Sequence, residues 1–312
     1  MNPKQALPKL WRVHAFTGLE HALLRVGFAW VVWCFVDSAR TYSVQPSPNG
    51  LAQYLDLTFM SDPALELPLK LGLVLALLAY VANRFLVVSL GYIAAYLICL
   101  GTLKNSQGAI GHSSQLITLT ACVQWFAHAT HPVLQRWRLV AKHSVHDVAV
   151  HYAQQGIAAA YMLAGITKLI RSDGRWIHKS VNLASSIVKA KEQQYYNALE
   201  GTGTESGMAI AEWILANQEL ARIMFGSALL LELGACIALF HRRLAILVGL
   251  SIVAMHEGIR QLMSLNFKYN IMVLTVYFIQ APCLLAWLYR TRLQNALPPM
   301  WQQRIANFVS VD

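Results

Sequence analysis

Long apolar segments recur along the whole chain, and they limit the folds that it can adopt. A helix that crosses the hydrocarbon core of a membrane needs about 20 mostly apolar residues. Eight segments approach that length, at about 20–36, 67–83, 85–103, 109–129, 148–170, 220–240, 243–261 and 268–289. The sequence therefore predicts an all-α integral membrane protein, a polytopic bundle of about eight transmembrane helices. Counts of seven to nine also fit, because the second segment is short and has polar ends.

The composition and the distribution of charge agree with a membrane protein. Apolar residues make up 56% of the chain and charged residues only 13%, with a mean hydropathy of +0.43, whereas a soluble domain has about 25% charged residues. The net charge is +10, but the basic residues lie in short clusters between apolar segments, as in Arg242 and Arg243. That spacing indicates loops at a membrane surface rather than a nucleic-acid site. The expected partners are membrane lipid and a lipophilic small molecule, and no nucleic acid.

The charges of the loops also predict an orientation. With eight spans, most basic residues of the short loops lie on the side of the N-terminus, which places both termini in the cytoplasm. The chain is thus expected to be a multi-pass protein of the plasma (bacterial inner) membrane, without a cleavable signal. Residues 1–312 are read as a single transmembrane domain. Residues 37–66 and 171–219 become extracytoplasmic loops, the second holding either an interfacial amphipathic helix or a solvated connector.

Three ionisable residues fall at a similar predicted depth near the outer ends of their spans: His112, Lys168 and His256. An ionisable group inside a span costs at least about 2.5 kcal/mol, so it needs a partner, a cavity or a route to the headgroups. Lys168 alone could simply extend to the headgroups, and His112 could cap its own helix. One cavity that opens to the outer face would explain all three residues together.

The chemistry of such a cavity suits proton abstraction from a hydrophobic hydroxyl compound such as a hydroquinone. Burial favours the neutral amine of a lysine, which is a good general base. Histidines at the same level can donate hydrogen bonds to a developing oxyanion or relay a proton. Glu232 is the most deeply placed acid, expected to be protonated or paired with Arg25.

A second group of polar residues could bind a metal. His143, Asp147 and His151 recur every four residues and could share one face of a helix. They lie at the inner boundary of the fifth expected span, where polar residues are common in any case. We therefore predict no metal site.

Three segments resemble one known family. AGITKLIRSDGRW resembles the AGxxKL…W motif of vitamin K-dependent γ-carboxylases and of their bacterial relatives, the "horizontally transferred transmembrane" (HTTM) domain proteins. GHSSQLITLTACVQWFA is similar to the histidine-bearing helix of that family, and HEGIRQLMSLNFKYNIMVLTVYFIQAPCLL is similar to its helix with an H…(L/M)xxxxF pattern. The resemblance covers about residues 20–289.

This resemblance implies specific roles. Lys168 would be the base that deprotonates a reduced quinone of the vitamin K or menaquinol type, which then reacts with molecular oxygen. His112 and His256 would belong to the same active site. Apart from the resemblance, we expect Trp176 to line the mouth of the site and Glu257 and Arg260 to contact the substrate.

The chain also departs from the carboxylase pattern. Gly111 stands where the carboxylases have an asparagine before the first histidine, and the chain stops at Asp312 without their large lumenal region. Carboxylation of a protein glutamate is therefore not expected, and the prediction keeps only the membrane part, with a quinone-sized pocket and a basic lysine.

Two other classes remain open from the sequence. A non-enzymatic transporter or a membrane assembly subunit would fit the composition, although transporters often show repeats and broken helices that the sequence does not clearly show. A quinone-linked oxidoreductase subunit of the DoxX type is a second enzymatic alternative. Proteins of that type have about half as many spans, so the span count separates it from the main prediction.

Overall fold

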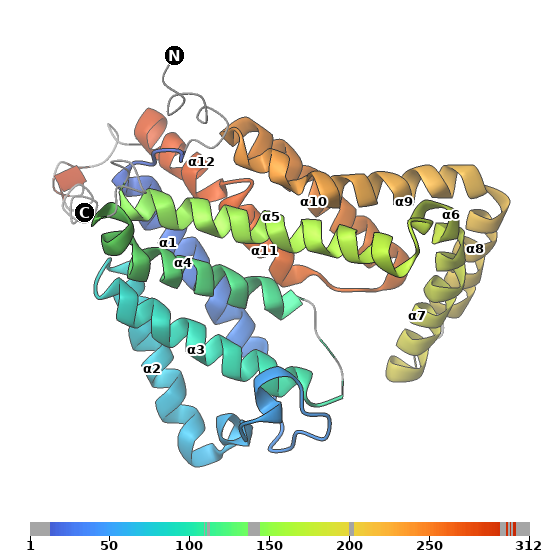
Figure 1. Cartoon of the computed structure of the whole chain (residues 1–312), viewed down its shortest axis with the longest axis horizontal. Coiled ribbons are helices and arrows are strands. Elements are labelled where there is room, and N and C mark those ends of the chain that lie inside the picture. Colours follow the sequence, from blue (N-terminus) through green and yellow to red (C-terminus); the bar gives the residue numbers. More distant parts are fainter. Residues whose placement is uncertain are drawn as a thin grey trace. The chain divides into compact units, whose positions relative to one another are not determined.

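The computed structural model (Figure 1) describes residues 13–108, 110, 113–136, 144–199, 203–293, 298, 300, 302 and 303. Over these residues the regular structure is entirely helical, as the sequence predicts. The longer helices are α1 (Gly18–Ser38), α2 (Pro63–Val81), α3 (Leu86–Asn105), α4 (Ser113–Arg136), α5 (Val145–Arg171), α7 (Leu183–Ala198), α8 (Gly203–Ala216), α9 (Gln218–Leu233), α10 (Arg242–Met263), α11 (Lys268–Tyr277) and α12 (Ala281–Leu288). The short elements are η2 (Gly50–Gln53), η3 (Thr58–Ser61), α6 (Trp176–Lys179), η4 (Ser180–Asn182), η5 (Gly234–Leu239) and η6 (Tyr289–Leu293).

Each of the eight expected spans contains helix among its described residues, but fewer are apolar enough to cross a membrane by length and composition. Among the described residues five helices meet that criterion: Gly18–Ser38, Pro63–Val81, Leu86–Asn105, Gln218–Leu239 and Arg242–Met263. A sixth is reached if α11 and α12, which bend by 46° at a short break, count as one span. The structure thus supports a multi-pass membrane protein with five or six candidate spans.

Helices α4 and α5 make the difference between this count and eight. They are 24 and 27 residues long, which at about 1.5 Å per residue exceeds the thickness of the hydrocarbon core. Their mean hydropathy is low because they carry polar side chains such as Gln124, His128, His151 and Gln154. All four residues are buried, with 9% exposure or less, so these polar groups face protein rather than the surroundings.

The chain divides into two compact units, residues 1–157 with 272–312 and residues 158–271. In the first unit α2, α3 and α4 pack in sequence against one another, and α1 packs against α12 (Figure 1). Its core holds an aromatic cluster, in which Phe28 lies edge-on to Tyr80 and Tyr277 at ring distances of 6.2 and 5.8 Å. The Tyr80 hydroxyl donates to the side-chain oxygen of Gln124 at 2.8 Å.

The last expected span is broken between α11 and α12. Gln280 adopts a left-handed conformation (φ 55°), and Pro282 follows in the first turn of α12. Proline has no amide hydrogen to continue the α11 hydrogen-bond ladder, so the break occurs where the sequence removes a donor. The sequence shows no clear sign of a broken helix, and the break at Gln280 corrects that reading.

The second unit contains a helical hairpin that the sequence analysis did not foresee. Residues 171–219 were expected to hold an interfacial helix or a connector; the structure forms α6, η4, α7 and α8 there, with α7 and α8 side by side (Figure 1), and a position at a membrane interface stays a prediction. Gly207 permits their close approach, because a Cβ atom there would lie 2.9 Å from the Cβ of Lys191. Val181, Ala184, Ile187, Ala211 and Ile214 form part of the buried apolar cluster at this end of the unit.

Candidate functional site

Lys168 lies near the C-terminal end of α5 and forms an ion pair with Glu232 of α9. The ammonium nitrogen is 2.6 Å from Oε1 and 2.5 Å from Oε2 of the carboxylate. The side chain of Glu232 is only 7% exposed, whereas that of Lys168 is 31% exposed. Glu232 therefore has a partner that the sequence analysis did not give it, since protonation or pairing with Arg25 was expected there. Lys168 was expected to be an amine in a dry pocket; in the structure it is half-buried and bound to a carboxylate.

Gly165 explains why these two helices approach closely enough for the pair to form. A Cβ atom on Gly165 would lie 2.9 Å from Cδ2 and 3.4 Å from the backbone nitrogen of Leu233, the residue after Glu232. Gly165 precedes Lys168 by three residues, so both lie on the same side of α5. The glycine and the lysine of AGITKL thus serve one purpose: the glycine lets α9 approach, and the lysine meets its carboxylate.

The chain turns sharply after α5 and brings Trp176 back over the lysine. Asp173 (φ 54°) and Gly174 (φ 74°) are both left-handed, and the Gly174 amide donates to the Leu169 carbonyl at 2.9 Å, which closes the end of the helix. Trp176 then begins α6, and its ring lies 5.6 Å from the Lys168 ammonium, within cation–π range. The segment AGITKLIRSDGRW therefore contains the glycine that lets α9 approach, the lysine of the ion pair, the turn that ends α5 and the tryptophan that packs over the lysine.

Tyr161, two turns before Lys168 on α5, holds His256 of α10. Its hydroxyl oxygen is 2.7 Å from Nε2 of the imidazole, and both residues are buried. Phe267 stacks on the other side of the histidine, with ring centroids 4.4 Å apart and an angle of 22° between the planes. Asn270 of α11 also hydrogen-bonds to Tyr161 through its side chain. These contacts fix both the position and the plane of the imidazole.

Tyr161 and Lys168 lie on the same face of α5. Residues seven apart are two turns apart in an α-helix, so Tyr161 and Lys168 point the same way. Lys168 is near enough to His256 to interact with it electrostatically. The second unit therefore presents a lysine–carboxylate pair and a tyrosine–histidine pair side by side, which is an arrangement suited to accepting and transferring protons.

The other predicted site residues have different positions. His112 lies outside the described residues, so its place beside Lys168 and His256 stays a prediction. Glu257 and Arg260 pair with each other within α10, with Nε of Arg260 3.0 Å from both carboxylate oxygens of Glu257. Their side chains are 40% and 54% exposed, whereas the neighbouring His256 is buried. Their predicted role in binding a substrate stays untested.

Asp147, in the first turn of α5, has hydrogen-bond partners within the first unit. Asp147 accepts a hydrogen bond from Nε2 of His21 at 3.0 Å and one from the Phe16 amide at 2.9 Å. Burial disfavours its ionised form, but the hydrogen bonds from His21 and Phe16 outweigh burial and lower the pKa of Asp147 from its ordinary 3.8. Among the described residues no group of three or more potential ligands could hold a metal; His143 lies outside them.

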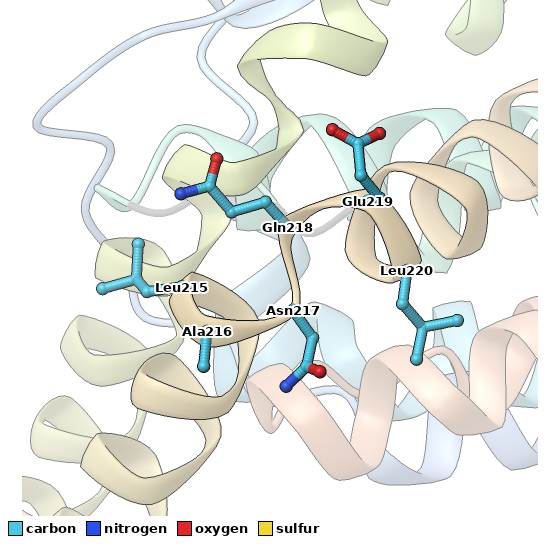
Figure 2. A pocket seen from close by; sticks show the side chains of 6 residues that line it. All are labelled: Leu215, Ala216, Asn217, Gln218, Glu219 and Leu220. Carbon is cyan, nitrogen blue, oxygen red and sulfur yellow. The ribbon is translucent and has the colours of Figure 1, made fainter.

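A surface hollow at the junction of α8 and α9 has few features of a binding site. Six consecutive residues, 215–220, line it, and Figure 2 shows that their side chains point to different sides of the chain rather than toward one point. Binding sites usually gather a few polar groups from several elements around an apolar cavity. We therefore place the candidate site at Lys168 and His256.

Sequence reasoning missed three residues of this site: Glu232 as the partner of Lys168, Tyr161 and Asn270. Tyr161 could have been found, because a spacing of seven residues places it on the face of Lys168. The pairing of Glu232 with Lys168 joins helices 64 residues apart, and the sequence holds no signal for that approach apart from Gly165.

Comparisons with known proteins do not place the chain in a family. No family model matches it, no curated protein matches it, and no solved structure matches it.

Proposed function

We propose that this chain is a γ-carboxylase-like membrane enzyme that deprotonates a hydroxyl group of a lipophilic hydroquinone or a similar small molecule. The contact between Lys168 and Glu232 carries the proposal. It is built from the residues of the AGITKL…W segment: Gly165 lets α9 approach α5, Lys168 binds the Glu232 carboxylate, and Trp176 covers the Lys168 ammonium.

Glu232 changes how the expected base would work. Because the Lys168 ammonium and the Glu232 carboxylate are in contact, the proton that a substrate gives up is accepted by the pair rather than by a lone amine. Acceptance takes the pair from a net charge of zero to +1, while the substrate oxygen becomes −1. The remaining N–H groups of Lys168 then stabilise that oxyanion at close range.

The surroundings favour this reaction over simple solvation of the lysine. Trp176 covers the ammonium on one side and Glu232 is almost completely buried, so water has limited access to the carboxylate, while the Lys168 side chain keeps 31% exposure. Electrostatic interactions are stronger where water is excluded. A reduced quinone would supply the electrons for a following reaction with oxygen. His112 is expected to assist in the same active site. Lys168 and Glu232 bind the substrate hydroxyl group and remove its proton.

We also propose that α4 and α5 cross the membrane, which gives the eight spans expected from the sequence. Both helices are long enough, and their buried residues include Gln124, His128 and Gln154. Polar side chains of membrane helices face the protein interior, and such helices score low in hydropathy. Both termini are then cytoplasmic, in a plasma membrane.

The experiment is turnover of a reduced quinone by the full chain in lipid nanodiscs. Quinones that copurify are identified by mass spectrometry, and oxygen consumption is followed with reduced menaquinone as the added substrate. We expect Lys168→Ala and Glu232→Gln to lower the rate by about 100-fold or more, the usual size of a general-base effect.

Matched controls come from exposed positions in the same unit. Lys189→Ala and Glu205→Gln make similar changes at exposed residues of α7 and α8, and we expect both to keep the wild-type rate. Turnover that survives Lys168→Ala would show that Lys168 is not part of the base.

The break between α11 and α12 favours a second function, small-molecule transport. Broken helices with freed backbone groups bind substrates in many transporters, and Gln280 at the break is 1% exposed. Uptake of a labelled quinol into proteoliposomes, unchanged by Lys168→Ala but abolished by Gln280→Ala, would favour this function over catalysis.

A further inference from the structure

Two buried polar atoms beside the Tyr161–His256 hydrogen bond have no hydrogen-bond partner among the residues that the structure describes. Nδ1 of His256 and Oδ1 of Asn270 are both inaccessible and unpaired, and the two residues are only 4% and 9% exposed. A buried polar atom without a partner costs about 1–3 kcal/mol, so such atoms are rare unless a ligand or water satisfies them. These two atoms belong to the two residues that contact the Tyr161 hydroxyl, His256 and Asn270.

The unpaired atoms show which group donates and which accepts in the hydrogen bonds among Asn270, Tyr161 and His256. Because Oδ1 of Asn270 is unpaired, the amide contacts Tyr161 through its Nδ2–H group and donates to the phenol oxygen. The Tyr161 hydroxyl therefore keeps its own proton for the atom that it contacts, Nε2 of His256 at 2.7 Å. In the opposite direction Nε2–H would donate to Tyr161, and the tyrosine proton would have no acceptor.

We propose that Asn270 and Tyr161 are positioning residues that hold His256 as the tautomer with its proton on Nδ1, leaving one donor and one acceptor for a hydroxylated aromatic ligand. An imidazole that accepts at Nε2 carries its proton on Nδ1, so Nδ1–H is a donor. Oδ1 of Asn270 is an acceptor. A phenolic hydroxyl can satisfy atoms of both kinds, whereas an ether oxygen can satisfy only the donor.

This inference rests on the proposed function for the choice of a hydroquinone as the natural ligand, but it makes a claim of its own about His256. It assigns the preference for a hydroxyl over an ether or a carbonyl to the tyrosine–histidine pair, and leaves deprotonation to Lys168 and Glu232. Phe267 contributes by stacking on the imidazole, which prevents rotation of the ring away from Tyr161.

The first test measures the tautomer without any ligand. The full chain is labelled with ¹⁵N-histidine in nanodiscs, and the signals of His256 among the 11 histidines are assigned by difference from His256→Gln. We expect a protonated Nδ1 and an unprotonated Nε2, and loss of this preference in Tyr161→Phe. The exposed Tyr196 gives the matched control, Tyr196→Phe, which should leave the spectrum unchanged. A protonated Nε2 in the wild-type protein would overturn the proposal.

The second test measures ligand preference with two probes that share one ring system and differ by an O-methyl group, 1-naphthol and 1-methoxynaphthalene. Binding is followed by tryptophan fluorescence in nanodiscs, with empty nanodiscs correcting for partition into lipid. We expect wild-type protein to prefer 1-naphthol by about tenfold, the worth of one hydrogen bond, and Tyr161→Phe and Asn270→Leu to lose the preference. Equal affinities in the wild type would mean that only water satisfies these atoms, which refutes the ligand assignment.

The outcomes separate this inference from the proposed function. A correct tautomer and probe preference without quinol turnover would sustain the inference and reject the enzymatic proposal. Turnover that depends on Lys168, combined with a protonated Nε2, would do the reverse.

Discussion

Gly165→Ala tests whether the approach of α5 to α9 builds the lysine–carboxylate pair. The new Cβ atom would lie 2.9 Å from Cδ2 and 3.0 Å from Cγ of Leu233, and 3.4 Å from its backbone nitrogen. Carbon atoms in favourable contact are about 3.5–4.0 Å apart, so either the Leu233 side chain moves or the helices separate by roughly 0.5 Å or more.

The magnitude comes from two opposing effects. Overpacking of a close contact costs about 1–3 kcal/mol, while replacing glycine with alanine inside a helix gains about 0.8–1 kcal/mol. The expected net effect is a loss of stability of up to about 2 kcal/mol. Gly258 of α10 supplies the matched control, because a Cβ atom there meets nothing within 4 Å. Gly258→Ala should keep the gain from helix propensity alone.

Reversible unfolding in mixed micelles, followed by circular dichroism, measures both variants. A double-mutant cycle of Lys168→Met and Glu232→Gln then gives the coupling energy of the pair in each background. We expect Gly165→Ala to reduce that coupling and Gly258→Ala to preserve it. Equal changes of stability in the two variants, with unchanged coupling, would refute the role given to Gly165.

Three further predictions concern the elements around the site. Glu232→Gln should destabilise the protein by less than the about 3–5 kcal/mol of a fully buried pair, because the Lys168 side chain is 31% exposed; chemical denaturation measures this, and adding Lys168→Met should restore part of the loss. Gly174→Ala places a side chain at φ 74° and should cost about 1 kcal/mol, with a lower Tm; an unchanged Tm would argue against the turn. The pKa of Asp147 is lowered by its hydrogen bonds with His21 and Phe16, against burial, so its contribution to stability should be present above pH 3.8 and disappear as the pH falls below that value. Thermal unfolding measured across this pH range should show a smaller fall in Tm with acid for Asp147→Asn than for the wild type.

The sequence was sufficient to predict the helices because long apolar segments leave the backbone no other way to satisfy its hydrogen bonds in lipid. From the sequence, however, all eight helices were expected to be similar apolar spans. α4 and α5 carry Gln124, His128 and Gln154, whose burial follows from packing that hydropathy does not measure. The α7–α8 hairpin was missed because the close approach of Gly207 to Lys191 and the shared cluster of Ala184, Ile187, Ala211 and Ile214 join two short helices, neither of which has a long apolar period.

For the candidate site, too, the sequence indicates individual residues but not how the helices pack. Lys168, Trp176 and His256 were identified from the sequence, since a charged or polar group near the end of an apolar segment is visible in one dimension. Glu232 was noticed as an isolated acid but was expected to be protonated or to pair with Arg25. Its contact with Lys168 depends on the rotation of α9 relative to α5, and neither periodicity nor composition determines a rotation between two helices.

The place of Lys168 along α5 has a consequence for how a substrate would arrive. Lys168 is three residues from Arg171, the last residue of α5, a rise of about 4.5 Å. Under the proposed topology the ion pair lies near the border between hydrocarbon and headgroups. An amphiphile dissolved in that leaflet already holds its hydroxyl group at this depth and its tail in the lipid. It could reach the pair by lateral diffusion alone and leave in the same way, without crossing the membrane or passing through water.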